Sequence, residues 1–238
     1  AGRHDRKRSC LQRRWKPESN STGRSVVEPW NAAYRGLDCD GKVNTNTRSD
    51  TVAATESNML ELGTVAPDFS LPDADGAVHE LTHDAPAVLV MFICNHCPFV
   101  KHVRAELARI GEDYVERGVA IYAINSNDLD NYPQDGPVAM RQESASLGYR
   151  FPYLLDEDQS VAKLYMAACT PDFYVFDADR RLVYRGQLDD SRPSNRMPVN
   201  GSDIRAALDA VLAGEAVDPD QVPSIGCNIK WKPGNEPT

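Results

Sequence analysis

Two uninterrupted apolar runs stand out in the hydrophobic pattern of the chain. Residues 87–93 and 119–125 have the sequences AVLVMFI and VAIYAIN, and such runs without polar alternation are typical of strands buried on both faces of a sheet. Between them, Pro98 opens a stretch to about Arg117 in which apolar residues recur at helical spacing, and Gly118 follows it. This order predicts a strand, a helix and a second, parallel strand.

Shorter segments flank this unit on both sides. We expect strands at 69–71 and 78–81 around a turn at 73–76, helices at 137–147 and 158–165, and strands at 173–176 and 182–185. We expect Ser202 or Asp203 to cap a last helix that reaches about Ala213 and is closed by Gly214. The pattern predicts an α/β fold whose central strands are parallel and whose later hairpin is antiparallel.

The first 58 residues have a different composition from the rest. They are rich in Arg, Ser, Asn and Thr and lack hydrophobic periodicity, so we interpret 1–58 as a disordered basic extension and 59–238 as the folded domain with a short tail. Met59 is the first methionine, which leaves a second interpretation open: the segment is upstream sequence translated from a misplaced start. No function is assigned to Cys10 or Cys39.

Charge separates the two parts and limits the partners. The chain carries a net charge of −9, with 11 basic and 7 acidic residues in 1–58. The remainder therefore has 26−11 = 15 basic and 35−7 = 28 acidic residues, a net charge of −13. An acidic domain has little with which to neutralise phosphates, so a nucleic-acid partner is not expected. No apolar run is long enough to cross a bilayer, so no membrane partner is expected either.

The candidate chemistry lies in Cys94-Asn95-His96-Cys97-Pro98, between a buried strand and a helix. A cysteine at a helix N-terminus faces unpaired N–H groups and the positive end of the helix dipole, which favour thiolate over thiol. We therefore expect Cys94 to be the ionised nucleophile and Cys97 the resolving thiol of a redox pair.

His96 lies between the two cysteines, and two interpretations of it are open. As an imidazolium or a polar donor it would stabilise the Cys94 thiolate and make the couple more oxidising than a Gly-Pro dipeptide would. As an exposed loop residue it would have no electronic role. A metal site built from Cys94 and Cys97 with His96 or His102 is an alternative, but 59–238 has no second C-x-x-C, so no metal or cofactor is predicted.

Three segments carry a resemblance to a known family. Residues 63–69 (GTVAPDF) resemble the opening of redoxin-type members of the thioredoxin superfamily, Cys94–Cys97 matches the thioredoxin active site in position, and residues 170–176 (TPDFYVF) resemble its cis-proline loop and following strand. Together with the tail 227–231 (CNIKW), the sequence is similar to peroxiredoxin-like bacterial proteins of the AhpC/TSA type. The resemblance covers about residues 60–215 and implies a thioredoxin fold.

The resemblance also implies roles for residues near the end of the chain. It implies a cis Pro171 beside the Cys94–Cys97 pair, with the backbone of Thr170 exposed to pair with a substrate's extended chain. Cys169 would then lie near the active site, and Cys227 is in a tail that can fold back. Our hypothesis is that Cys169 and Cys227 form a second dithiol that relays electrons to or from Cys94–Cys97; the alternative is two independent buried thiols.

These observations favour thiol–disulfide exchange with protein disulfides or small thiols, driven by an upstream thiol reductant. The main rival is peroxide reduction, but the P-x-x-x-[T/S]-x-x-C pattern of peroxiredoxins places Val90 and Cys94 before Cys97, or Ala87 and Met91 before Cys94, and neither frame matches. A dithiol metal-binding module is the third alternative. Because no secretory signal is visible, we expect a cytoplasmic location, where the pair would rest mainly as a dithiol.

Overall fold

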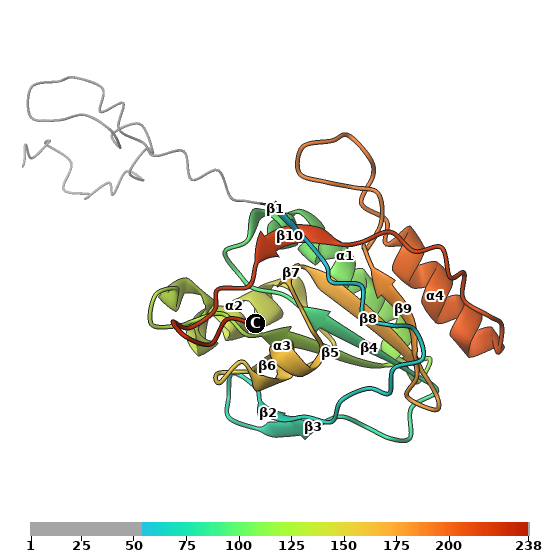
Figure 1. The fold of residues 1–238 in the computed structure, drawn as a ribbon, viewed down its shortest axis with the longest axis horizontal. Helices are drawn as coiled ribbons and strands as arrows, with labels where there is room; N and C mark the ends of the chain where they lie inside the picture. Colours follow the sequence, from blue (N-terminus) through green and yellow to red (C-terminus); the bar gives the residue numbers. More distant parts are fainter. Residues whose placement is uncertain (1–53, 238) are drawn as a thin grey trace, which may run out of the picture. The chain divides into compact units, whose positions relative to one another are not determined.

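The structure is a computed structural model that describes residues 54–237 (Figure 1). The predicted disordered extension, with Cys10 and Cys39, therefore lies outside the described residues except at its end. Within 54–237, no helix combines the length and the apolarity that crossing a bilayer requires.

A five-stranded mixed sheet forms the centre of the fold, in the order β6-β5-β4-β8-β9. The strands are β4 (Ala87–Phe92), β5 (Ala120–Asn125), β6 (Tyr153–Leu155), β8 (Asp172–Asp177) and β9 (Leu182–Gly186). β4 pairs in parallel with β5 and antiparallel with β8, and β8 and β9 form an antiparallel hairpin. This confirms the predicted sheet, apart from β6, which the sequence pattern did not reveal.

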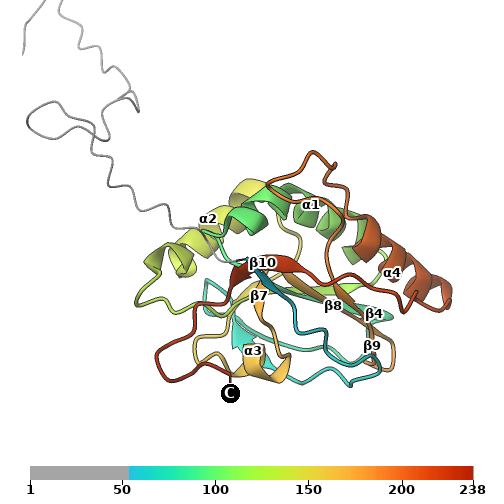
Figure 2. The same cartoon turned by 45° about the horizontal axis from the view of Figure 1, so that its top comes forward.

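Helices cover both faces of this sheet (Figure 2). They are α1 (Pro98–Val115), α2 (Pro137–Leu147), α3 (Ser160–Leu164) and α4 (Ser202–Ala213). A hydrophobic cluster lies on each face of the sheet, and alternate residues of β4 pack into the two clusters. Leu89 and Met91 pack in the cluster that includes α1 and α4, whereas Val90 and Phe92 pack in the cluster that includes α3. The hairpin of β2 (Ser70–Pro72) and β3 (Val78–Glu80) contributes Leu71 to the second cluster. The continuous apolar run of β4 is thus explained by burial on both sides.

The helix ends differ slightly from the expected ones. α4 begins at Ser202, but its N-cap is Gly201 with φ of 64°, not Ser202 or Asp203. A positive φ is a conformation that glycine adopts without steric cost. The predicted closing residue, Gly214, is confirmed as the C-cap with φ of 71°.

A second, three-stranded sheet was not predicted. It has the order β1-β10-β7, with β1 (Ala54–Glu56), β7 (Cys169–Thr170) and β10 (Ile225–Asn228) all paired antiparallel. Figure 1 shows β10 lying between β1 and β7. The folded domain consequently starts before the predicted boundary at residue 59. β1 escaped prediction because three residues with no apolar alternation give no strand signal.

Candidate active site

The Cys94–Cys97 motif lies where β4 is followed by α1. β4 ends at Phe92, and α1 begins at Pro98 with Cys97 as its N-cap. Pro at the first helical position suits the start of a helix because its missing N–H would have no intrahelical partner. Both cysteines are buried and both are free thiols. The sequence therefore places the pair at the N-terminal end of a helix, as expected.

The cis-proline loop lies directly against the two sulfurs. The Thr170–Pro171 peptide bond is cis, which confirms the expectation from the family resemblance. The Cys94 Sγ lies 3.4 Å from the Thr170 hydroxyl, and the Cys97 Sγ lies 3.1 Å from the Thr170 carbonyl oxygen. Thr170 thus touches both members of the pair, one through its side chain and one through its backbone.

The ionisation of the pair differs from the expected one. A hydrogen bond from the Cys227 thiol, a second from Cys94 and the backbone N–H of Val100 hold the pKa of Cys97 well below its usual range. The interaction with Cys97, burial and the negative charge of Asp135 raise the pKa of Cys94. These directions favour the thiolate at Cys97, whereas the sequence led us to expect it at Cys94. Cys97 is also the helix N-cap, next to the positive end of the helix dipole.

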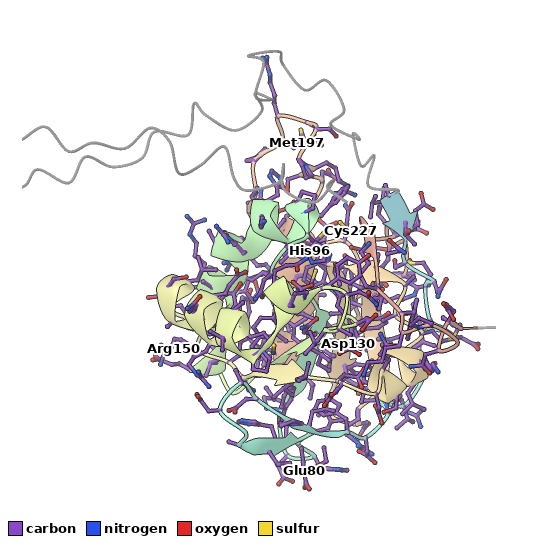
Figure 3. All side chains as sticks on the ribbon, turned by 90° about the vertical axis from the view of Figure 1, so that its left-hand side faces the viewer. Glu80, His96, Asp130, Arg150, Met197 and Cys227 are labelled. Atoms are coloured by element: carbon purple, nitrogen blue, oxygen red, sulfur yellow. The ribbon has the colours of Figure 1, made fainter. Side chains whose placement is uncertain are left out.

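His96 contacts both Cys94 and a carboxylate that the sequence did not single out. Its Nδ1 lies 3.9 Å from the Cys94 Sγ and 2.5 Å from an oxygen of Asp135. The imidazole stacks on Tyr132, with ring centroids 5.4 Å apart. Figure 3 labels His96 and Cys227, which lie close together in that view. His96 is therefore held by specific contacts rather than left as a free loop residue.

Asp135 anchors the loop that carries the two cysteines. It is fully buried and accepts hydrogen bonds from the backbone N–H groups of Asn95 and His96 at 2.9 and 3.0 Å, and from the Asn127 amide at 2.8 Å. The Tyr153 hydroxyl donates to the Asn95 side chain at 2.9 Å. Sequence reasoning missed these residues because Asp135 is one of several acids in a polar loop, and only the tertiary structure distinguishes it.

Cys227 lies against Cys97, not against Cys169. The Cys97 and Cys227 sulfurs are 2.7 Å apart, whereas the Cys169 thiol donates to the carbonyls of Pro171 and Ser224. The register explains this: Cys227 is directly opposite Thr170 in the β10–β7 pair, and successive residues of a strand point to opposite faces. The tail folds back as expected, but the predicted Cys169–Cys227 dithiol does not form. Burial raises the pKa of Cys169 as well.

The backbone of Thr170 is already paired. We expected it to be exposed for a substrate's extended chain, but β10 lies antiparallel to β7 at this position, and Thr170 is only 3% exposed. Gly226 makes the approach sterically feasible, because a Cβ at this position would lie 2.1 Å from the Thr170 carbonyl oxygen. The chain itself therefore occupies the edge predicted for a partner.

A possible metal ligand set overlaps the redox pair. Among the described residues, Cys94, His96 and Asp135 each offer a ligand atom, and these atoms lie within 4.8 Å of one another. One sulfur, one nitrogen and one oxygen are donor types that zinc accepts. The set includes neither Cys97 nor His102, which the sequence had suggested as ligands. The hydrogen bond between His96 and Asp135 would have to break before the imidazole Nδ1 could bind a metal ion.

Comparison with known proteins assigns the chain to a family. The model of the AhpC/TSA family matches residues 62–185. The chain belongs to the AhpC/TSA family. This match and the mixed sheet flanked by helices confirm the thioredoxin-type α/β fold and the redoxin resemblance expected from the sequence.

Solved structures similar to this family member include two proteins of unknown function. One, an uncharacterized conserved protein from Geobacillus kaustophilus, is 59% identical with a TM-score of 0.74, and the alignment covers 76% of this chain and 97% of that one. A hypothetical protein from Sinorhizobium meliloti 1021 is 54% identical with the same TM-score, covering 76% and 100%. The thiol-disulfide oxidoreductase ResA of Bacillus thuringiensis subsp. konkukian is 22% identical over 130 residues, 54% of this chain and 71% of ResA.

Proposed function

We propose that this AhpC/TSA-family protein is a thiol–disulfide oxidoreductase whose exchanging pair is Cys94 and Cys97. The observation that carries the proposal is the placement of both sulfurs against Thr170, at the start of α1 and beside the cis Pro171. The similarity to ResA, a protein named as a thiol-disulfide oxidoreductase, supports the same reaction class. The substrates are disulfides of proteins or small molecules, and a thiol reductant restores the dithiol.

Cys94 is the cysteine proposed to meet the substrate. Its sulfur lies next to His96, whose side chain is 23% exposed, whereas the Cys97 sulfur lies among the buried Thr170 carbonyl and Cys227. We assign the role of base to Cys97, because its hydrogen bonds hold its pKa low. Cys97 accepts the proton of Cys94 as the Cys94 sulfur attacks the substrate disulfide and the first substrate thiolate leaves.

The second half of the reaction returns the charge to Cys97. The departing thiolate takes the proton back from Cys97, and the Cys97 thiolate then attacks the Cys94 sulfur of the mixed disulfide. The Cys94–Cys97 bond forms as the bond to the substrate breaks, and the second substrate thiolate takes a proton from solvent. One disulfide has been reduced to two thiols, and one dithiol of the protein has been oxidised.

A trapping experiment tests this assignment. The full chain and its Cys94→Ser, Cys97→Ser and Cys169→Ser variants are incubated with glutathione disulfide and analysed by intact mass. We expect Cys97→Ser to accumulate a stable glutathione adduct on Cys94, and Cys169→Ser to behave as the wild type. If Cys97→Ser formed no adduct and the wild type reduced neither glutathione disulfide nor insulin, the proposed function would be wrong.

Peroxide reduction is a second candidate because the family model that matches is that of AhpC/TSA. Hydrogen peroxide consumption by the same variants separates the two reactions. Fast consumption that only one of the two cysteine substitutions abolishes would favour a peroxidase. Zinc and copper analysis of the reduced protein tests the metal-binding alternative on the same samples.

A further inference from the structure

β10 has the position and pairing of a bound substrate strand. It runs antiparallel to β7, with Cys227 opposite Thr170 and Asn228 opposite Cys169. The Ile229 N–H extends the ladder by donating to the Ala168 carbonyl at 3.1 Å. An extended chain that pairs with the residue before the cis-proline, and carries a cysteine at that residue, presents its sulfur to the redox pair.

The Cys227 sulfur meets Cys97 rather than Cys94. The two sulfurs are 2.7 Å apart, and the side chains are 2% and 0% exposed. A disulfide bond is about 2.05 Å long, so a small displacement of either side chain brings the sulfurs to bonding distance. Cys97 therefore has two sulfur neighbours, Cys94 on one side and Cys227 on the other.

The tail that carries Cys227 is fixed by several independent contacts. The Lys230 N–H donates to the Asn127 side chain at 2.9 Å, and the Asp128 N–H donates to the Lys230 carbonyl at 2.8 Å. The Lys232 N–H donates to the Gln159 side chain at 2.9 Å. The first two bonds join the tail to the loop that also contains Asp135, and the third joins it to the N-cap of α3. These hydrogen bonds fix the tail, so the position of Cys227 next to Cys97 is set by the fold.

We propose that Cys227 is a third redox cysteine, which exchanges with the Cys94–Cys97 disulfide to give a buried Cys97–Cys227 disulfide. The inference rests on the proposed function, because substrate reduction supplies the initial Cys94–Cys97 bond. The Cys227 thiolate attacks the Cys97 sulfur, the Cys97–Cys227 bond forms, and the Cys94–Cys97 bond breaks with Cys94 leaving as the thiolate. Cys94 takes up the proton that Cys227 loses, so no external oxidant or reductant is consumed.

This exchange changes the chemistry that the oxidised protein presents. The oxidising equivalent moves from a bond that includes Cys94, which lies beside the partly exposed His96, to a bond between Cys97 and Cys227. Cys94 becomes a lone thiol beside His96 and is again able to attack a disulfide. An upstream reductant then reaches the buried bond through Cys94, by the reverse exchange, or after β10 leaves β7.

Disulfide mapping of four forms of the full chain tests the proposal. The wild type, Cys94→Ser, Cys227→Ser and the matched control Cys169→Ser are oxidised with glutathione disulfide, digested without reduction and analysed by mass spectrometry. We expect the Cys97–Cys227 link in most oxidised wild-type and Cys169→Ser chains. Cys94→Ser is expected to keep Cys97 and Cys227 as thiols, because the exchange starts from the Cys94–Cys97 disulfide. Cys227→Ser is expected to form Cys94–Cys97 instead. Thermal unfolding establishes that each variant is folded, and Cys94→Ala replaces Cys94→Ser if it is not.

The outcomes separate this inference from the proposed function. If Cys94→Ser forms the Cys97–Cys227 link as completely as the wild type, the exchange through the Cys94–Cys97 disulfide is refuted. If the oxidised wild type contains mainly Cys94–Cys97, the role of Cys227 is refuted. The proposed function survives that result provided that Cys227→Ser forms Cys94–Cys97 and exchanges with glutathione. If Cys227→Ser forms no Cys94–Cys97 bond and exchanges with nothing, the proposed function itself fails.

Discussion

Replacing Asp135 with Asn tests how the active-site loop is held. The carboxylate is fully buried; one oxygen accepts from the backbone of Asn95 and His96, and the other lies 2.5 Å from the His96 Nδ1 and 2.8 Å from the Asn127 amide nitrogen. An Asn side chain keeps one acceptor for the backbone but turns an NH2 group toward Asn127. A donor then faces a donor, and a buried amide loses its partner.

The expected cost follows from those bonds. A hydrogen bond to a charged group contributes about 1.5–3 kcal/mol, and a buried donor left unpaired costs about 1–3 kcal/mol. With the His96 contact weakened as well, we expect Asp135→Asn to lower the free energy of unfolding by about 2–4 kcal/mol. For a domain of this size the midpoint of thermal unfolding should fall by about 5–15 °C.

The same substitution should change the ionisation of Cys94. The charge of Asp135 raises the pKa of Cys94, so its removal should move the pH midpoint of Cys94 alkylation by iodoacetamide to lower pH. The series is run at a temperature well below the unfolding midpoint of the variant, because exposure of Cys94 by unfolding would also move its alkylation midpoint to lower pH. Alkylation at Cys94 is followed by peptide mass spectrometry across a pH series.

Asp130→Asn is the matched control, because Asp130 lies in the same loop and is exposed. Exposed substitutions of this kind usually change stability by less than about 0.5 kcal/mol. The reasoning is refuted if Asp135→Asn unfolds at the same temperature as Asp130→Asn, or if its Cys94 profile stays in place or moves to higher pH.

Three further substitutions have defined outcomes. Burial raises the pKa of Asp172 from 3.8 to about 7, so its stabilising effect is present below about pH 4 and is lost as pH rises through 7. The stability of Asp172→Asn relative to the wild type should therefore be greater at pH 8 than at pH 5, by about 3 kcal/mol, and equal differences at both pH values would contradict this. Gly226→Ala should push β10 off Thr170, because the added Cβ would lie 2.1 Å from the Thr170 carbonyl oxygen; insulin reduction should rise relative to glutathione disulfide reduction, whereas Asn228→Ala, an exposed change in the same strand, should leave the ratio unchanged. His96→Ala removes the ring 3.9 Å from the Cys94 sulfur and should give a more reducing couple against glutathione, and a potential no lower than that of the wild type would exclude His96 from setting it.

The sequence predicted those parts of the fold that its local pattern specifies. β4 and β5 are long apolar runs, and α2 has the predicted bounds of 137–147 because Pro137 begins it and Gly148 follows it as the C-cap. β1, β7 and β10 have two to four residues each, too few for a period of two to appear. Their existence depends on pairing between segments far apart in the chain, which no local pattern encodes.

The parts of the site that a local motif specifies were predictable, and the parts that depend on tertiary structure were not. The two cysteines at the strand–helix junction and the cis Pro171 follow from motif and resemblance, and the structure has both. The partner of Cys227 depends on the register of β10 against β7, and a shift of one residue would direct its side chain to the opposite face. The role of Asp135 likewise depends on a loop folding under Asn95, which the spacing of polar residues does not reveal.

The edge strand β1 connects a distant part of the chain to the redox centre. It lies on one side of β10 and β7 lies on the other, although more than 110 residues separate β1 from β7 in the sequence. Residues 54–56 pair along the free side of β10, and the Ser57 N–H donates to the Ser224 carbonyl at 2.9 Å. Separation of β1 from β10 would remove one of the two strand pairings that hold β10 in place. A binding protein, a protease or a fusion tag acting near residue 54 would thus alter the reactivity of Cys97 without touching it.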